Sequence, residues 1–174
     1  MPAPALTHAA RLVRDFDRER FVTALFAPAE RREALMVLYA FNTEIARVQE
    51  SVREPMAGMI RLQWWRDTLI AGAEGALLDH HPVARPLGEL IRSHDLGLDL
   101  FEDLISSREA DLEGGQPSDM DALCRYAERS SAALSQLAAR ILGAEQGWDA
   151  FHPTITRRRS RPVRLFFAHL LGQY

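Results

Sequence analysis

Apolar residues recur every three or four positions along much of the chain, and this period constrains the fold more than any other feature. The clearest apolar stripe consists of Leu35, Leu38, Phe41, Ile45, Val48 and Val52. Such spacing places the side chains on one face of an amphipathic helix. Because Pro28 and Pro55 flank the segment, the pattern predicts one long helix over residues 29–52, with the stripe from Leu35 to Val48 buried.

The other segments also favour helices, and none alternates as a strand does. Helical patterns cover residues 56–71, 83–94, 98–113 and 118–142. In the last of these, Ser118 is the predicted N-cap, and Asp119 falls in the first turn, where the helix dipole favours negative charge. The sequence therefore predicts an all-α fold.

The chain has 174 residues, enough for one domain with its own core. No apolar run approaches the roughly 20 residues that span a bilayer, and the N-terminus lacks the basic start and apolar stretch of a secretory signal. The single cysteine, Cys124, excludes an intramolecular disulfide, and we expect it to be buried. We expect a cytoplasmic protein, with peripheral association at the inner membrane as the alternative.

Three motifs, taken in order, resemble the squalene/phytoene synthase family. They are Leu38-Tyr39-Ala40-Phe41 after Pro28-Ala29-Glu30-Arg31-Arg32, then Leu62-Gln63-Trp64-Trp65-Arg66-Asp67, then Arg125-Tyr126 leading through Ala132-Ala133 to Ile141-Leu142-Gly143. The resemblance covers about residues 18–143. It implies an isoprenoid-synthase-like helical bundle around an apolar cavity, here truncated.

Active members of that family join two prenyl diphosphates head to head, and aspartates on two facing helices hold Mg²⁺. Hard carboxylate oxygens suit Mg²⁺, which neutralises the diphosphate leaving group. In this sequence the leading aspartates of the first motif fall on Ala46 and Arg47, and its last falls on Glu50. The second motif should lie beyond residue 150, and the sequence reaches Tyr174 without it. The resemblance therefore implies no cofactor and no metal site. If the chain is catalytically active, we expect it to use Mg²⁺, with Glu50 as a weak candidate ligand.

The aspartate-poor pattern is closest to a branch related to mitochondrial complex I assembly factors. It implies a module without prenyl-transfer activity that binds a partner protein or a prenyl lipid. The alternative is an enzyme, a Mg²⁺-dependent head-to-head prenyltransferase of the squalene/phytoene synthase type. The candidate cavity or binding residues are Glu44, Arg47, Glu50, Arg108, Asp111 and Tyr126.

These residues also have purely structural interpretations. Arg47 and Glu50 are spaced for an ordinary helix ion pair, and Arg108 and Asp111 would also suit a solvated face. Adjacent tryptophans on a helix point about 100° apart. At most one of the pair at positions 64 and 65 can therefore face a cavity, and core packing is the expected role.

His80 and His81 have no carboxylate or cysteine at ligand spacing, so we expect a loop without a metal role. The start of active family members is serine-rich and binds phosphate. Here it is replaced by Arg18-Glu19-Arg20-Phe21.

The composition changes near residue 146. Residues 1–146 carry 16 arginines and 23 acidic residues, whereas residues 147–174 carry five arginines and one aspartate. We therefore predict a family-like helical domain over 1–146 and an arginine-rich tail over 147–174, which a shift of reading frame explains most simply. A bundle lacking its second half exposes apolar surface, so we expect self-association. The tail could favour a peripheral membrane contact, but we expect no nucleic-acid partner.

Overall fold

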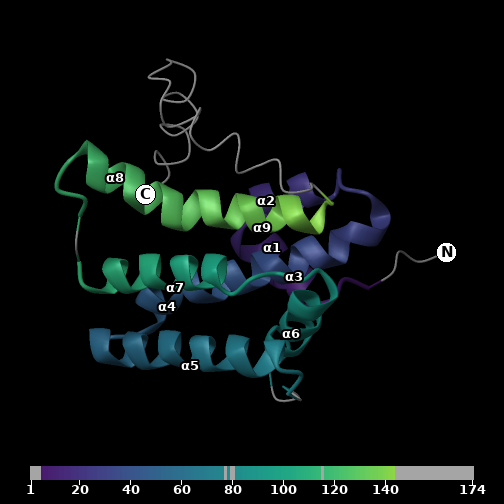
Figure 1. Cartoon of the computed structure of the whole chain (residues 1–174), viewed down its shortest axis with the longest axis horizontal. Helices are drawn as coiled ribbons and strands as arrows, with labels where there is room; N and C mark the ends of the chain where they lie inside the picture. Colours follow the sequence, from purple (N-terminus) through teal and green to yellow (C-terminus); the bar gives the residue numbers. More distant parts are fainter. Residues whose placement is uncertain (1–4, 77, 79–80, 115, 144–174) are drawn as a thin grey trace. The chain divides into compact units, whose positions relative to one another are not determined.

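The computed structural model describes residues 5–76, 78, 81–114 and 116–143. Its elements are α1 (His8–Phe16), α2 (Arg18–Ala24), α3 (Ala29–Ala46), α4 (Val48–Ser51), α5 (Pro55–Ala73), α6 (Ala84–Ser93), α7 (Asp99–Leu112), α8 (Met120–Ala127), the π-helix η1 (Glu128–Ala132) and α9 (Ala133–Ile141) (Figure 1). The described residues contain no strand, so the predicted all-α class is confirmed. His80 and the predicted tail, residues 147–174, lie outside the described residues.

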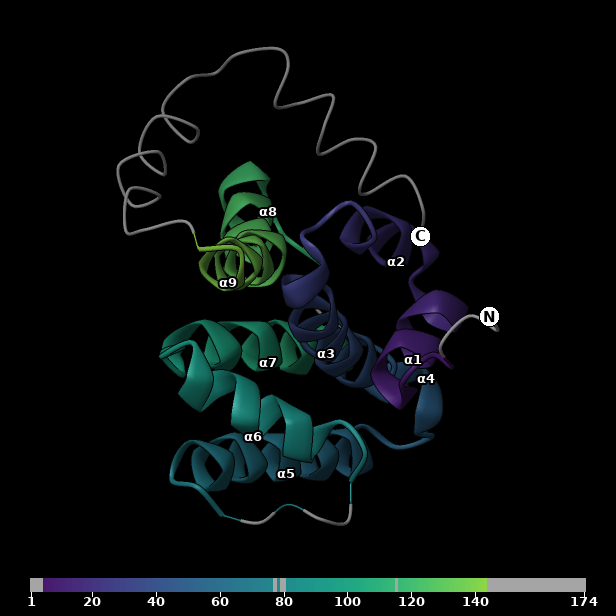
Figure 2. The same cartoon turned by 90° about the vertical axis from the view of Figure 1, so that its right-hand side faces the viewer.

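Helix α3 is the central element and contacts α1, α2, α6, α7 and α9 (Figure 2). The predicted stripe of α3 and α4 is buried from Leu35 to Val48, as expected. Within it, the Phe41 ring meets Trp65 of α5 edge-on at 5.2 Å between centroids, and meets Phe101 of α7 at 5.6 Å. Edge-to-face contacts of this kind add to the gain from burial. Three helices are thus joined through one phenylalanine.

Three layers are stacked beside α3: the α8–η1–α9 rod, then α7, then α5 (Figure 1). Helix α7 is the middle layer and contacts both of the others. The two tryptophans of α5 point in different directions, as expected for adjacent residues on a helix. Trp65 is buried in the core between α3 and α5, which confirms the expected packing role, whereas Trp64 is 43% exposed. None of the described helices combines the length and apolar character needed to cross a bilayer.

The long helix predicted over residues 29–52 is interrupted at Arg47. Helix α3 ends at Ala46, Arg47 has φ −82° and ψ 0°, and α4 follows. A ψ near zero departs from the regular α-helix value of about −42° and bends the chain. Despite the bend, Val48 is buried, so the apolar stripe continues into the core in a new direction.

The predicted cap of the last helix was also wrong. Asp119, not Ser118, is the N-cap, because its Oδ1 accepts the Ala122 N–H at 2.7 Å. An ionised carboxylate is a stronger acceptor at a helix N-terminus than a hydroxyl. Ser118 instead donates its hydroxyl to Asp119 Oδ2 at 3.1 Å.

The predicted helix over 118–142 contains a π turn, in which the Ala133 N–H donates to the Glu128 carbonyl. That bond spans five residues rather than four. Cys124, on α8, is exposed rather than buried, because α8 buries none of its residues.

Helices α5 and α6 approach very closely where Gly72 meets Gly88. A Cβ on either glycine would lie 3.0 Å from the other's Cα. Arg92 also donates to the Gly72 carbonyl oxygen at this crossing. The two backbones can approach this closely only because neither residue carries a side chain.

Candidate functional site

The Arg47 guanidinium occupies the end of α3, where the resemblance places a metal-binding aspartate. Its central carbon lies 3.6 Å from the centroid of the Phe16 ring, a cation–π arrangement with the end of α1. Its Nε lies 3.8 Å from Glu50 Oε2. A positive charge is therefore already held between an aromatic face and a carboxylate at this position.

Among the described residues, the ion pair of Arg47 is with Glu50 and not with Glu44. Glu44 acts instead on His81, whose pKa is lowered by burial, while the Glu44 carboxylate opposes this shift. The His81 Nδ1 accepts the backbone N–H groups of Val83 and Ala84 at 3.3 Å each, at the start of α6. The charge of Glu44 therefore acts on the loop before α6.

Three candidates from two different helices meet between α7 and α8. Arg108 Nη1 donates to Asp111 Oδ2 at 3.1 Å, and the Tyr126 hydroxyl donates to the same oxygen at 3.3 Å. Arg108 Nη1 also lies 3.4 Å from the Tyr126 hydroxyl oxygen. The Arg108 and Asp111 side chains are only 19% and 26% exposed, so packing holds them in place. The three form one polar triangle rather than an open solvated face.

Helix α4 lies between the two groups of candidates. Its Glu50 pairs with Arg47, and its Gln49 donates Nε2 to the Asp111 carbonyl oxygen at 3.1 Å. We call the set Arg47, Glu50, Arg108, Asp111 and Tyr126 the α4 polar site. Gln49 thus connects the Arg47–Glu50 pair to the triangle, and the set holds five of the six candidate residues.

Arg66 has a structural role that the sequence did not reveal. It is on α5, and its Nε lies 2.9 Å from Glu102 Oε2, while Nη2 lies 2.8 Å from Glu109 Oε2, both on α7. These bonds raise the pKa of Arg66 and lower that of Glu102. The clamp fixes the register of α7, which carries Arg108 and Asp111. The position of Arg66 directly after the tryptophan pair, on a helix that packs into the core, was the signal that could have suggested it.

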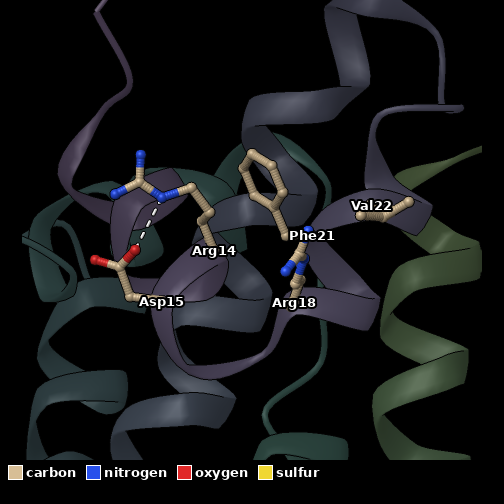
Figure 3. A pocket seen from close by; sticks show the side chains of 5 residues that line it. All are labelled: Arg14, Asp15, Arg18, Phe21 and Val22. Carbon is tan, nitrogen blue, oxygen red and sulfur yellow. Dashed lines mark hydrogen bonds and ion pairs between the residues drawn. The ribbon is translucent and has the colours of Figure 1, made fainter.

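A surface pocket of about 400 Å³ lies at the junction of α1 and α2 (Figure 3). Its lining is Arg14, Asp15, Arg18, Phe21 and Val22. Arg14 donates its Nε to Asp15 Oδ1 at 2.8 Å, so that guanidinium is partly neutralised. Guanidinium groups beside a phenylalanine suit an anionic group attached to an apolar chain. This is the part of the chain where the serine-rich start of active family members is replaced.

Within the part of the chain that the structure describes, no three histidine, cysteine, aspartate or glutamate side chains lie close enough together to hold a metal ion. Glu50, the weak candidate, has Arg47 as its ion-pair partner. Its side chain is 72% exposed.

Comparison with known proteins gives a family match and a set of relatives. Residues 13–161 match the family model described as "Squalene/phytoene synthase", a range that ends inside the predicted tail. The human "NADH dehydrogenase (ubiquinone) complex I, assembly factor 6" is 33% identical over 135 residues, covering 76% of this chain and 39% of the human protein. The Dictyostelium discoideum homolog of that factor is 28% identical over 142 residues, covering 80% of this chain and 39% of its own.

A relative with an enzymatic name is also similar. The "Presqualene diphosphate synthase" of Rhodopseudomonas palustris is 27% identical over 143 residues, covering 82% of this chain and 49% of that protein. The chain therefore spans 39% to 49% of the length of these relatives.

Proposed function

Because the chain belongs to the squalene/phytoene synthase family, we propose that it acts as a non-catalytic member that binds a protein partner. The partner class is a subunit or assembly intermediate of an NADH dehydrogenase complex. The single observation that carries this proposal is Arg47, a fixed cation where active members hold Mg²⁺.

The chemistry of this position opposes metal-dependent catalysis. A divalent ion bound to Glu50 would lie beside the Arg47 guanidinium, which the Phe16 ring holds in place. The two positive charges would share one carboxylate and repel each other. A single exposed carboxylate offsets little of that repulsion. We therefore propose that the chain uses no cofactor. If it were active, Mg²⁺ would supply the charge neutralisation that diphosphate departure requires.

The names of the relatives support protein binding over catalysis. The human and Dictyostelium discoideum proteins are both named as complex I assembly factors or their homologs. The α4 polar site offers charged groups that packing already holds in position, at Arg108 and Asp111. Preorganised groups lose less conformational entropy on binding a partner. We propose that a partner docks at this site, at a peripheral position on the membrane that carries the complex.

Deletion of the gene in its host tests the assembly role. We expect less assembled NADH dehydrogenase in the membranes, measured by native gel electrophoresis with in-gel NADH oxidation. The wild-type gene should restore assembly. Arg108→Ala, checked for folding by circular dichroism, should restore it less well than the matched surface change Arg85→Ala. Unchanged assembly after deletion would overturn the proposal.

The presqualene diphosphate synthase relative makes an enzyme the second candidate. Purified protein with Mg²⁺ and farnesyl or geranylgeranyl diphosphate should give no head-to-head product by mass spectrometry. Product formation that disappears in Glu50→Ala would make Glu50 a true metal ligand and favour the enzyme. A prenyl lipid is a further ligand class, and the pocket with Arg18 and Phe21 is where we would expect it. Loss of lipid binding in Phe21→Ala would support that location.

A further inference from the structure

Arg47 is the open cation of the α4 polar site. The other arginine of the site, Arg108, already donates to Asp111 Oδ2 at 3.1 Å. Within the part of the chain that the structure describes, the Arg47 side chain makes no hydrogen bond, and its ion-pair partner Glu50 stays 3.8 Å from Nε. That separation allows electrostatic attraction but is too long for a hydrogen bond. The Arg47 guanidinium is therefore partly neutralised but still lacks a hydrogen-bond acceptor.

The Arg47 guanidinium presents one edge to solvent. Its Nε is buried and has no acceptor among the described residues, and one face rests on the Phe16 ring, 3.6 Å from the centroid. The Nη1 and Nη2 atoms are not buried in this way, and the side chain as a whole is 42% exposed. Stacking on a ring uses the face of a guanidinium and leaves the N–H groups in its plane free. The edge formed by Nη1 and Nη2 is therefore the part that a ligand can reach.

We propose that this edge binds a carboxylate of the protein partner, which replaces Glu50 as the ion-pair partner of Arg47. The proposal rests on the protein-binding function proposed above and adds the chemistry that the partner presents. A planar guanidinium fits a carboxylate through two parallel N–H···O bonds. Because Phe16 already fixes the orientation of the guanidinium, the side chain loses little conformational freedom on binding.

The charges around Arg47 favour a carboxylate over a phosphate group. Exchange of Glu50 for another singly charged carboxylate leaves the net charge at Arg47 unchanged. A phosphate monoester carries about −1.5 to −2 at pH 7. It would add negative charge to a part of the chain, residues 1–146, that already has 23 acidic residues against 16 arginines. The Glu50 side chain is 72% exposed, so it can turn into water when it is displaced.

Titration with sodium acetate, followed by ¹⁵N NMR of the arginine side chains, tests the site with a simple carboxylate. Sodium chloride keeps the ionic strength constant. We expect the Arg47 signal, identified by its loss in Arg47→Lys, to move along a saturating curve. Glu50→Gln should tighten acetate binding about two- to fivefold, because it removes a weak, exposed competing ion pair. Phe16→Leu should weaken binding by about the same factor, because the guanidinium loses its aromatic support.

Asp103→Asn is the matched control. Asp103 Oδ1 lies 4.0 Å from Arg129 Nε in a similarly long, exposed ion pair, but among the described residues Arg129 stacks on no aromatic ring. The Arg129 signal of this variant should respond to acetate without saturating. Equal saturation at Arg129 would show a general attraction to arginine and overturn the proposal. A Glu50→Gln protein without saturation at Arg47, or a wild type that binds inorganic phosphate more tightly than acetate, would overturn it as well.

Complementation of the gene-deletion strain separates this inference from the assembly role. Arg47→Lys keeps the charge but cannot form the two parallel bonds, so it should restore NADH dehydrogenase assembly less well than the wild type. Glu50→Gln should restore assembly fully. If deletion impairs assembly and Arg47→Lys restores it completely, the assembly role stands and the carboxylate site is refuted. If deletion leaves assembly unchanged while acetate still saturates Arg47, the site is supported and the assembly role is refuted.

Discussion

The guanidinium carbon of Arg47 lies 3.6 Å from the centroid of the Phe16 ring. This contact joins the last residue of α1 to the residue that ends α3. Glu50 adds a longer ion pair, with 3.8 Å between Arg47 Nε and Glu50 Oε2. Arg47, at the position where the resemblance places a metal-binding aspartate, thus takes part in packing two helix ends together.

A double-mutant cycle on Arg47 and Phe16 should reveal this contact. With Arg47→Ala and Phe16→Leu, we expect a coupling free energy of about 0.5–1 kcal/mol from urea unfolding. Glu50→Gln should change the free energy of unfolding by less than about 0.5 kcal/mol, because exposed ion pairs contribute little. Strictly additive effects of the two substitutions would contradict the cation–π assignment.

Removing Arg66 should destabilise the protein more than removing an ordinary surface arginine. In Arg66→Met, the partly buried Glu109 and its neighbour Glu102 lose their partner. We expect a loss of about 1–3 kcal/mol in the free energy of unfolding. Arg14→Met, which breaks the exposed pair with Asp15, is the control and should leave the free energy of unfolding nearly unchanged. Equal costs would show that the clamp does not secure α7 against α5.

Acidification should weaken the same clamp. The Arg66 bond lowers the pKa of Glu102 in the folded protein. The stability that this carboxylate contributes is therefore fully present above the ordinary pKa of glutamate and is lost as pH falls through the folded value. The difference in unfolding free energy between wild type and Glu102→Gln should shrink over that acidic range, measured by urea unfolding at a series of pH values. A difference independent of pH would argue against the assignment.

Alanine at the α5–α6 crossing should be costly. In Gly88→Ala, the new Cβ meets the Gly72 backbone at 3.0 Å, and neither backbone can give way without moving its helix. We expect about 1–3 kcal/mol of destabilisation. Gly58→Ala is the matched comparison, because its Cβ meets only the ends of the flexible Leu112 side chain. Gly58→Ala should lower the melting temperature less than Gly88→Ala does. A larger decrease for Gly58→Ala would contradict the backbone contact between α5 and α6.

His81 should give the protein a pH dependence near neutrality. Burial lowers its pKa in the folded chain, so the unfolded chain binds more protons between the folded value and the ordinary histidine value of about 6.5. The free energy of unfolding should therefore fall as pH drops below that ordinary value. His81→Asn keeps an acceptor for the N–H groups that start α6 but cannot titrate. Urea unfolding across this range should show a shallower slope for the variant, and an unchanged slope would rule out His81 as its source.

The sequence predicted the buried stripe of α3 well, because burial of an apolar face dominates helix packing and leaves a regular period. It did not predict the break at Arg47, because the break depends on tertiary contacts. Val48 is buried in the core and Arg47 stacks on Phe16 of another helix. Ser118 and Asp119 are both good capping residues, so propensity alone could not choose between them. Helices α1 and α2 were missed because they have only nine and seven residues, too few for the apolar spacing to identify a helix by itself. The Thr7 hydroxyl oxygen caps α1 by accepting the Ala10 N–H.

In the candidate site too, contacts within one helix could be predicted from the sequence, whereas contacts between helices could not. Arg108 and Asp111 are spaced to meet on one helix, and they do. Tyr126 comes from a separate helix, and only the packing of η1 and α9 against α7 brings its hydroxyl to Asp111. Glu44 is close to Arg47 in sequence, but its electrostatic partner is His81. Distance along the chain could not distinguish these cases.

The π turn at Glu128–Ala132 leaves a mark that sequence alignment should detect. A π turn contains one residue more than an α turn of the same helix. Residues 120–141 therefore have the form of a regular helix with a single-residue insertion, which rotates α9 relative to the phase set by α8. A relative lacking that residue could keep the faces of both helices unchanged. Its alignment with this chain would then carry a one-residue gap inside a helix, where gaps are usually penalised most heavily.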